Sequence, residues 1–244
     1  MDDPGTMEDL IKDTGDNGDR INTHHSLKTY CPDLACIWEN MQKGKGLSTN
    51  FVCDLFKNFE DPNDWKNVLD IRAGSIKEKP AAYGKTEIKQ GIIYITINKN
   101  NCGGTDKLDM YETIQHELIH AKIINECMNL YGFDGTTVNS LSFSQAFEKL
   151  VIHEYGKNAT KDEHKLILDK YLHDMVNDLI NITGKGTYDD YIGLVLNGFP
   201  KDILLQCGYA VGGGPGTVED KYHTYQVFKH NNPDIFNNLN KVCP

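Results

Sequence analysis

The chain has 244 residues, of which 39% are hydrophobic and 25% charged, so it can bury a substantial core as one domain with appendages. Its formal net charge of −10 disfavours binding to a nucleic-acid phosphate backbone. Because no run of about 18 apolar residues occurs, we expect a soluble protein with no membrane span.

The first segment, residues 1–25, is rich in Asp, Gly, Asn and Thr and poor in large apolar side chains. Such a composition buries too little surface to offset the entropy lost on ordering, so we expect a loose arm. Apolar residues spaced three and four apart then predict two short helices, at 34–43 and 49–59.

Seven cysteines occur in the chain, so at least one stays unpaired within a monomer. Cys31 and Cys36 are close enough in sequence to form a disulfide or bind a metal ion, but no second pair with zinc spacing follows. Free buried thiols are the simpler interpretation. The N-terminus lacks a basic-then-apolar secretion signal, which leaves the bacterial cytoplasm and export by another route both open.

The central part of the chain has the clearest predicted elements. Residues 91–98, GIIYITIN, are β-branched and predict a strand, which we place at the edge of a small twisted sheet. Thr105 or Asp106 is available to cap a long helix over about 107–131. A loop at 133–140 follows.

Four further helices are expected after this loop. The first ends at Gly156 and the second ends before Gly184, since glycine commonly terminates helices. Residues 189–199 and 201–210 are also expected to be helical. A glycine-rich loop at 211–222 and a polar tail complete the chain.

The long helix carries the sequence HELIH, in which His116 and His120 are four residues apart and Glu117 lies between them. Residues four apart share one helix face, so the two imidazoles can bind one metal ion. Glu117 is rotated by about 100° from His116, where it can contact a metal-bound water. This is the H-E-x-x-H pattern of zinc hydrolases. The alternative is a pair of core histidines that only form hydrogen bonds.

A zinc hydrolase needs a third protein ligand, and a fourth position is left for water. His164 continues an apolar stripe that includes Leu168 and Tyr171, and Glu154 lies on the apolar stripe of the preceding helix. Four other candidates fall away from these faces: Glu148, His153, Glu163 and His173. We therefore prefer His164 as the third ligand and keep Glu154 as the alternative.

The stretches TIQHELIHA and EHKLILDKYLHDMVNDLI resemble the SprT-like zinc metallopeptidases, and AAYGKTEIKQGIIYITIN is similar to their substrate-side strand. The resemblance covers roughly residues 80–200. It implies an α+β, zincin-like fold, in which a small twisted β-sheet packs on an active-site helix and a third-ligand helix. It also implies Zn²⁺ held by His116, His120 and His164, with Glu117 as general base. The chain departs from the family in its long gap before the third ligand and in lacking a zinc ribbon.

These observations predict a zinc-dependent metalloendopeptidase that acts on a protein or peptide substrate, with an extended peptide pairing along the edge strand. Tyr171 lies two turns beyond His164 and could stabilise an oxyanion, although a core role is the simpler interpretation. Asp109 and Thr113 are candidates to orient a ligand histidine through its second nitrogen. We divide the chain into the arm, a metallopeptidase domain at 26–200, and an extension at 201–244 that packs on or trails it.

Three functions remain open at this level. The first is a bacterial housekeeping metallopeptidase. The second is a secreted or contact-delivered protease effector, possibly the end domain of a longer polypeptide, with a cognate inhibitor protein encoded alongside. The third is a non-catalytic, metal-stabilised binding module, which Glu117 disfavours because a closed structural site needs no base.

Overall fold

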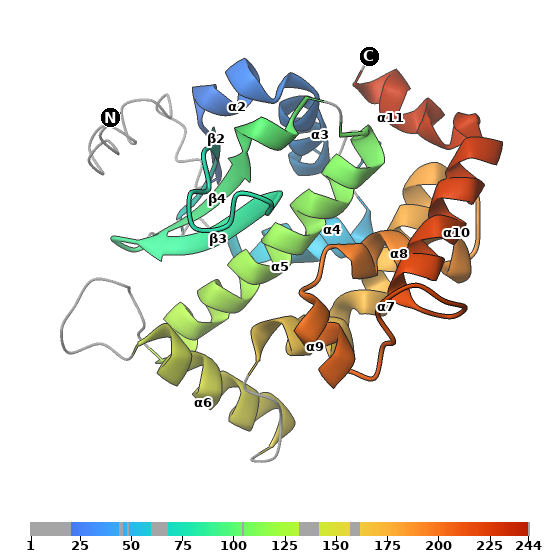
Figure 1. Ribbon diagram of the computed structural model, residues 1–244. Coiled ribbons are helices and arrows are strands. Elements are labelled where there is room, and N and C mark those ends of the chain that lie inside the picture. Colours follow the sequence, from blue (N-terminus) through green and yellow to red (C-terminus); the bar gives the residue numbers. More distant parts are fainter. Residues whose placement is uncertain are drawn as a thin grey trace.

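A long central helix, α5 (Lys107–Tyr131), organises the α+β fold of the computed structural model. A small sheet with its covering helices lies on one side of α5, and the helices of the second half of the chain lie on the other (Figure 1). The structure describes residues 21–43, 46–47, 49–59, 68–103, 105–131, 142–156 and 162–243.

The sheet has four strands in the order β1-β2-β4-β3. Strands β1 (Ile21–Thr23), β2 (Val68–Gly74) and β4 (Ile92–Asn98) run parallel, and β3 (Gly84–Lys89) is antiparallel to β4. A two-residue turn joins β3 to β4, and both of its residues, Gln90 and Gly91, have positive φ. Such turns match the right-handed twist of the strands they connect.

The predicted strand at 91–98 is confirmed, but its predicted place at the sheet edge is wrong. β4 lies between β2 and β3, and β3 forms the edge. The reason is visible in the composition of β4, because isoleucines occupy both of its faces and Ile92, Ile93 and Ile95 are all buried. A strand that is apolar on both faces is typical of an interior position.

Three helices, which all precede β2 in the chain, contribute to the core beside the sheet: α2 (His25–Tyr30), α3 (Pro32–Gln42) and α4 (Asn50–Phe56). Trp38 of α3 is fully buried, and its Nε1 donates a hydrogen bond to Thr23 Oγ1 at 2.9 Å. The predicted arm at 1–25 is therefore wrong for its last five residues, which form β1 and the start of α2. The remainder of that prediction lies outside the described residues, as does the predicted loop at 133–140.

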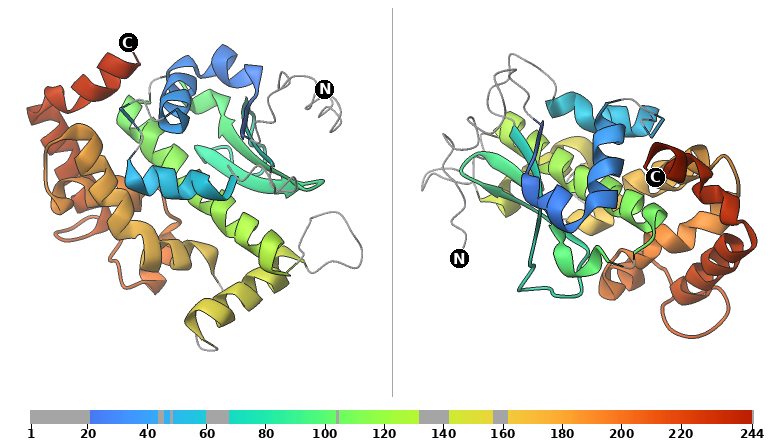
Figure 2. Two further views of the ribbon diagram at one scale, coloured as in Figure 1. Left: turned by 180° about the vertical axis from the view of Figure 1, so that it is seen from behind. Right: turned by 90° about the horizontal axis from the view of Figure 1, so that it is seen from above.

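The second half of the chain is helical, and Figure 2 shows these helices on the side of α5 away from the sheet. The predicted ends at Gly156 and Gly184 are confirmed, because both glycines cap helices with positive φ. No helix in the described ranges has the length and apolarity needed to cross a membrane. The helices are α6 (Phe143–Tyr155), α7 (Glu163–Thr183), α8 (Tyr188–Asn197), α9 (Lys201–Gln206), α10 (Val218–Asn231) and α11 (Asn237–Val242).

The expected polar tail is instead largely helical. Helix α10 packs directly on α8, and a Cβ atom at Gly193 of α8 would collide with the backbone of Lys221. Few apolar residues in α10 are buried, but Val218 and Tyr225 reach the core. A narrow apolar face of this kind is hard to recognise in a polar segment.

Two disulfides overturn the expectation of free buried thiols. Cys31 is bonded to Cys102 with a Cα–Cα distance of 5.1 Å, and Cys36 is bonded to Cys243 with a Cα–Cα distance of 5.7 Å. The first links the start of α3 to the segment after β4, and the second links α3 to the residue after α11. Cys53, Cys127 and Cys207 are not part of a disulfide.

Candidate metal centre

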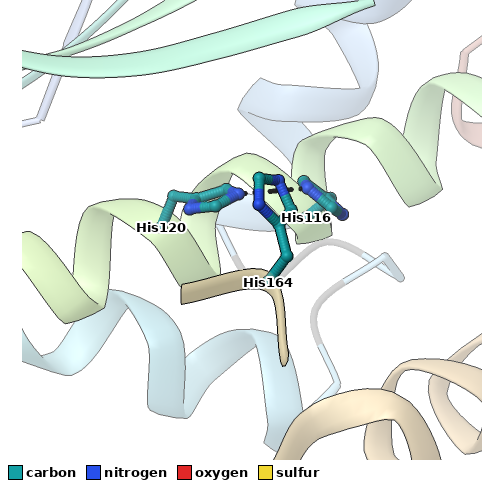
Figure 3. A group of neighbouring side chains, drawn as sticks. All are labelled: His116, His120 and His164. Atoms are coloured by element: carbon teal, nitrogen blue, oxygen red, sulfur yellow. Dashed lines mark hydrogen bonds between the residues drawn. The ribbon is translucent and has the colours of Figure 1, made fainter. Parts of the chain in front are cut away.

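Three histidines converge from two helices on one point. His116 and His120 project from adjacent turns of α5, and His164 projects toward them from the first turn of α7 (Figure 3). One nitrogen from each ring lies within 4.8 Å of the others, so the three side chains could hold a metal ion. The structure thus brings together the three ligands that the sequence predicted.

The local sequence sets the positions of both ligand-bearing helices. Asp106 accepts hydrogen bonds through Oδ1 from the backbone amides of Leu108 and Asp109, which makes it the N-cap of α5. Asp162 caps α7 by accepting from the amide of Lys165, and this cap places His164 at the second helical position.

A buried hydrogen-bond network fixes α5 against α7. Asp178 of α7 accepts hydrogen bonds through Oδ2 from the hydroxyl of Tyr111 at 2.7 Å and from the side-chain amide of Gln115. Burial raises the pKa of Asp178 to about 6, and these hydrogen bonds oppose that rise. Since Gln115 directly precedes His116, the network holds the ligand face of α5 in register with the helix that carries His164.

The spacing of the His116 and His120 nitrogens fits a shared ion. The Nε2 atoms of His116 and His120 are 3.1 Å apart, and two ligands of one tetrahedral zinc ion are separated by about 3.3 Å. His120 Nδ1 lies 2.8 Å from Glu163 Oε1. A proton on Nδ1 of neutral His120 would donate to that carboxylate and leave the Nε2 lone pair directed at the centre of the triad.

The pKa shifts favour the neutral form of His116 and His164. Burial, followed by the neighbouring His120, lowers the pKa of His164 to about 4, and burial lowers the pKa of His116 well below its usual range. Burial would lower the pKa of His120 too, but the Glu163 carboxylate reverses the direction and raises it. Nδ1 of His116 has no hydrogen-bond partner among the described residues.

Glu117 lies beside the triad and is held by the edge strand. Thr86 Oγ1 of β3 donates a hydrogen bond to Glu117 Oε2 at 2.6 Å. Gly84 leaves the room that this carboxylate occupies, because a Cβ atom there would lie 2.5 Å from Glu117 Oε1. Burial raises the pKa of Glu117, while the charge of His120 and the Thr86 hydrogen bond lower it in part.

The three ligands and Glu117 line a cavity of about 750 Å³, which we call the metal-site cavity. Its first wall is the segment from Tyr83 to Thr86, which includes the start of β3; this is the β3 wall. Its second wall is formed by Glu163, His164 and the loop at 197–200; this is the α7 wall. α5 supplies the floor, which includes Glu112 and Thr113.

The other predicted site residues lie elsewhere or act differently. Tyr171 is buried with its ring 6.5 Å from Phe51 and does not line the metal-site cavity. Glu154, the alternative third ligand, is exposed and pairs with the neighbouring His153. Asp109 accepts a hydrogen bond from the Tyr225 hydroxyl, and Thr113 donates one to the Asp109 carbonyl. Within the described residues, neither side chain bonds to a ligand histidine.

The sequence does not predict the roles of four residues of the site. Its pattern places Glu163 at a helix edge, away from the site, whereas Glu163 is the hydrogen-bond partner of His120. Gly84 and Thr86 contact Glu117 only because β3 lies over α5. Phe199 packs edge-on against His116 with ring centroids 4.8 Å apart and covers the ligands from the α7 wall. Only Glu163 had a usable signal, namely its position next to a candidate ligand at a helix start.

Comparisons of the chain with protein-family models, with curated proteins and with solved structures found no match. The assignment of a function therefore rests on the geometry and chemistry of the site.

Proposed function

We propose that the protein is a zinc metalloendopeptidase of the SprT-like type. The observation that carries the proposal is the convergence of His116, His120 and His164 within 4.8 Å, with the Glu117 carboxylate held beside them in a cavity of about 750 Å³. Three imidazoles form the donor set of catalytic zinc sites that keep a fourth position open. A purely structural site has no use for a buried base, which favours the enzyme over a metal-stabilised binding module.

The proposed reaction is the addition of water to a peptide bond. A bound zinc ion would polarise the carbonyl and lower the pKa of its bound water to about 7. Glu117 takes a proton from the water while the water oxygen bonds to the carbonyl carbon. The same carboxyl then delivers a proton to the amide nitrogen as the carbon–nitrogen bond breaks. The raised pKa of Glu117 makes it a stronger base than an ordinary glutamate, which suits a group that accepts a proton and later releases it.

The β3 edge supplies a place for the substrate. β3 pairs only with β4 in the described sheet, so its outer backbone groups can bond to an extended peptide. Thr86 of this strand bonds to Glu117. This hydrogen bond holds the proposed base next to the peptide that β3 would bind. The proposed substrate is accordingly an extended segment of a protein or peptide.

Metal analysis together with hydrolysis of unfolded casein tests the proposal. The purified protein should contain about one zinc ion per chain and cleave casein. Glu117→Gln should retain zinc and lose about 10²- to 10⁴-fold in rate, because general acid–base catalysis contributes effects of this size. Glu126→Gln, on the same helix but outside the cavity, is the matched control.

Equal cleavage by the wild-type and Glu117→Gln proteins would show that a contaminant is responsible and would end the proposal. Zinc binding without any cleavage by the wild type would favour the binding module instead.

The two disulfides favour the second candidate, an exported protease, over a housekeeping enzyme of the cytoplasm. Disulfides persist in oxidising compartments and are rare in the reducing cytosol. Cys31–Cys102 and Cys36–Cys243 connect residues 71 and 207 positions apart. Bonds that close loops of this length stabilise a fold by about 4 to 5 kcal/mol each in the chain-entropy model.

Thiol counting tests this second candidate. The protein isolated under non-reducing conditions from an oxidising compartment should expose three thiols after denaturation, and seven after reduction. Reduction should also lower the melting temperature by about 8 °C or more. Seven thiols before reduction would show that the disulfides do not form there and would remove this argument for export.

A further inference from the structure

The floor of the metal-site cavity contains a second acidic group that the proposed reaction does not use. Glu112 lies one helical turn before His116 on α5 and lines the cavity. Its side chain is not part of the histidine group that could hold a metal ion. Because Glu112 is neither a ligand nor the base, its presence in the cavity needs a separate explanation.

Glu112 is buried without a partner. Its exposed fraction is 6%, and Oε1 has no hydrogen-bond partner among the described residues. A buried carboxyl group in this state costs free energy, and native structures normally supply a donor or a counter-ion. Burial raises its pKa, and the charges of Asp109 and Glu117 raise it further. Lys79 and Lys85 line the same cavity, but within the described residues no ion pair joins either of them to Glu112.

The α7 wall comes close to this carboxyl group at a glycine. Gly198 lies opposite Glu112, and a Cβ atom at Gly198 would be 3.3 Å from Oε1 and 3.8 Å from Oε2. Gly198 has ordinary right-handed helical angles, so its backbone does not require glycine. What the glycine provides at this position is room beside the carboxyl oxygens.

The relative direction of β3 and α5 indicates which part of a bound peptide reaches Glu112. Tyr83, directly before β3, lines a small cavity together with Thr113, and Thr86 within β3 bonds to Glu117. β3 and α5 therefore advance in the same direction. A peptide that adds antiparallel to β3, the more stable pairing, runs the opposite way. Its residues after the scissile bond lie toward Glu112.

The geometry points to Glu112 as the specificity-determining residue that recognises a cationic side chain, lysine or arginine, at the position directly after the scissile bond. This inference rests on the proposed peptidase function. An ammonium or guanidinium group in the cavity beside Gly198 supplies the donor that this carboxyl group lacks, in a charge-assisted hydrogen bond. The ends of the cavity then have separate roles, because the triad acts on the carbonyl and Glu112 holds the following residue.

Mass spectrometry of casein digests gives the first test. Cut sites of the zinc-loaded wild-type protein should be enriched in Lys or Arg directly after the cleaved bond, and the enrichment should vanish in Glu112→Gln. Glu126→Gln removes the same charge from the same helix outside the cavity and should keep the enrichment. Casein cleavage that depends on Glu117 but shows no such enrichment would overturn this inference and leave the peptidase intact.

Paired peptides make the test quantitative. Two peptides built on the strongest cut site, with lysine or norleucine after the scissile bond, should differ about 10- to 100-fold in kcat/KM for the wild type and by less than about threefold for Glu112→Gln. Gly198→Ala keeps the charge of Glu112 but places a methyl group beside its carboxyl oxygens. It should therefore also reduce the ratio of the two kcat/KM values. An unchanged ratio in both variants would overturn the assignment.

A binding measurement separates recognition from catalysis. The zinc-loaded Glu117→Gln protein should bind the fluorescein-labelled lysine peptide more tightly than the norleucine peptide, by fluorescence anisotropy, and adding Glu112→Gln should equalise the two. Thermal unfolding of each variant shows whether the fold is kept. Equal binding of both peptides by a folded Glu117→Gln protein counts against Glu112. Absence of any casein cleavage would end the inference together with the proposed function.

Discussion

The two walls of the metal-site cavity differ in what they hold. The β3 wall contacts the proposed base, through the Thr86 hydrogen bond and the space left by Gly84. The α7 wall holds the proposed metal, through His164 itself and through Glu163, which bonds to His120. α5 lies between them and contributes to both. The comparison teaches that metal binding and proton transfer depend on different strands and helices, so substitutions should separate them.

The largest expected effect is on metal binding and comes from the α7 wall. His164→Ala leaves only two imidazoles and should weaken zinc binding by more than about 100-fold, since the loss of a ligand exceeds the loss of a ligand's hydrogen-bond partner. Competition with a chromophoric chelator measures the affinity. His173→Ala, an exposed histidine of the same helix, should have no effect. Wild-type affinity in His164→Ala would remove the α7 wall from the metal site.

The opposite result is expected on the β3 wall. In Gly84→Ala the new Cβ would lie 2.5 Å from Glu117 Oε1, so the flexible carboxylate must move. Casein hydrolysis should fall by about 100-fold, the order expected for a misplaced catalytic group, while zinc affinity stays unchanged. Gly103→Ala is the control, because that glycine is exposed and its Cβ would meet nothing within 4 Å. Loss of zinc in Gly84→Ala would break the division between the walls.

A smaller effect on metal affinity is expected from Glu163→Gln. The substitution keeps the shape but removes the charge that faces His120 Nδ1, and changes of this kind cost about 10- to 100-fold in affinity. The same chelator competition applies. Glu154→Gln serves as the control and also tests the alternative ligand, which the structure places on the surface. An effect of Glu154→Gln larger than that of Glu163→Gln would reverse their roles.

The smallest effect should come from Thr86→Val, which keeps the shape but removes the hydroxyl that donates to the Glu117 carboxylate and to the Glu117 carbonyl. We expect about a tenfold loss in kcat/KM at neutral pH, with zinc affinity unchanged. The Thr86 hydrogen bond lowers the pKa of Glu117, so its loss should raise that pKa further. Because the base must be deprotonated, the acid limb of the pH–rate profile should move to higher pH. Thr86→Ser should restore it; an unmoved limb in Thr86→Val would mean that Thr86 does not act on the base.

Local signals in the sequence predicted the ligand-bearing framework. His116 and His120 follow from helix periodicity, and the ends of α6 and α7 follow from Gly156 and Gly184. His164 was found because a ligand on an apolar helix face must point into the core. These inferences need only the geometry of a single helix, which is why they could be made without tertiary information.

Features that depend on pairing between distant segments could not be predicted. β3 carries few large apolar side chains, so its role as the edge strand became visible only from its position against β4 and α5. The cysteine pairs are separated by 71 and 207 residues, and no local spacing indicates such partners. α10 could not be predicted for a related reason. Its two buried residues form an apolar face that can be recognised only when α8 is known to pack against it.

The hydrogen bonds of Asp178 to Tyr111 and Gln115 have a consequence for how the protein would gain and lose its ion. They lock the helices that present the ligands by means of contacts that need no ion. Zinc binding should therefore require little ordering of the chain, so little of the binding free energy is lost to it. A zinc finger differs, because there metal binding is itself the folding reaction. Chelation should accordingly leave a folded apoprotein that regains its ion reversibly, which makes exchange for spectroscopically visible cobalt practicable.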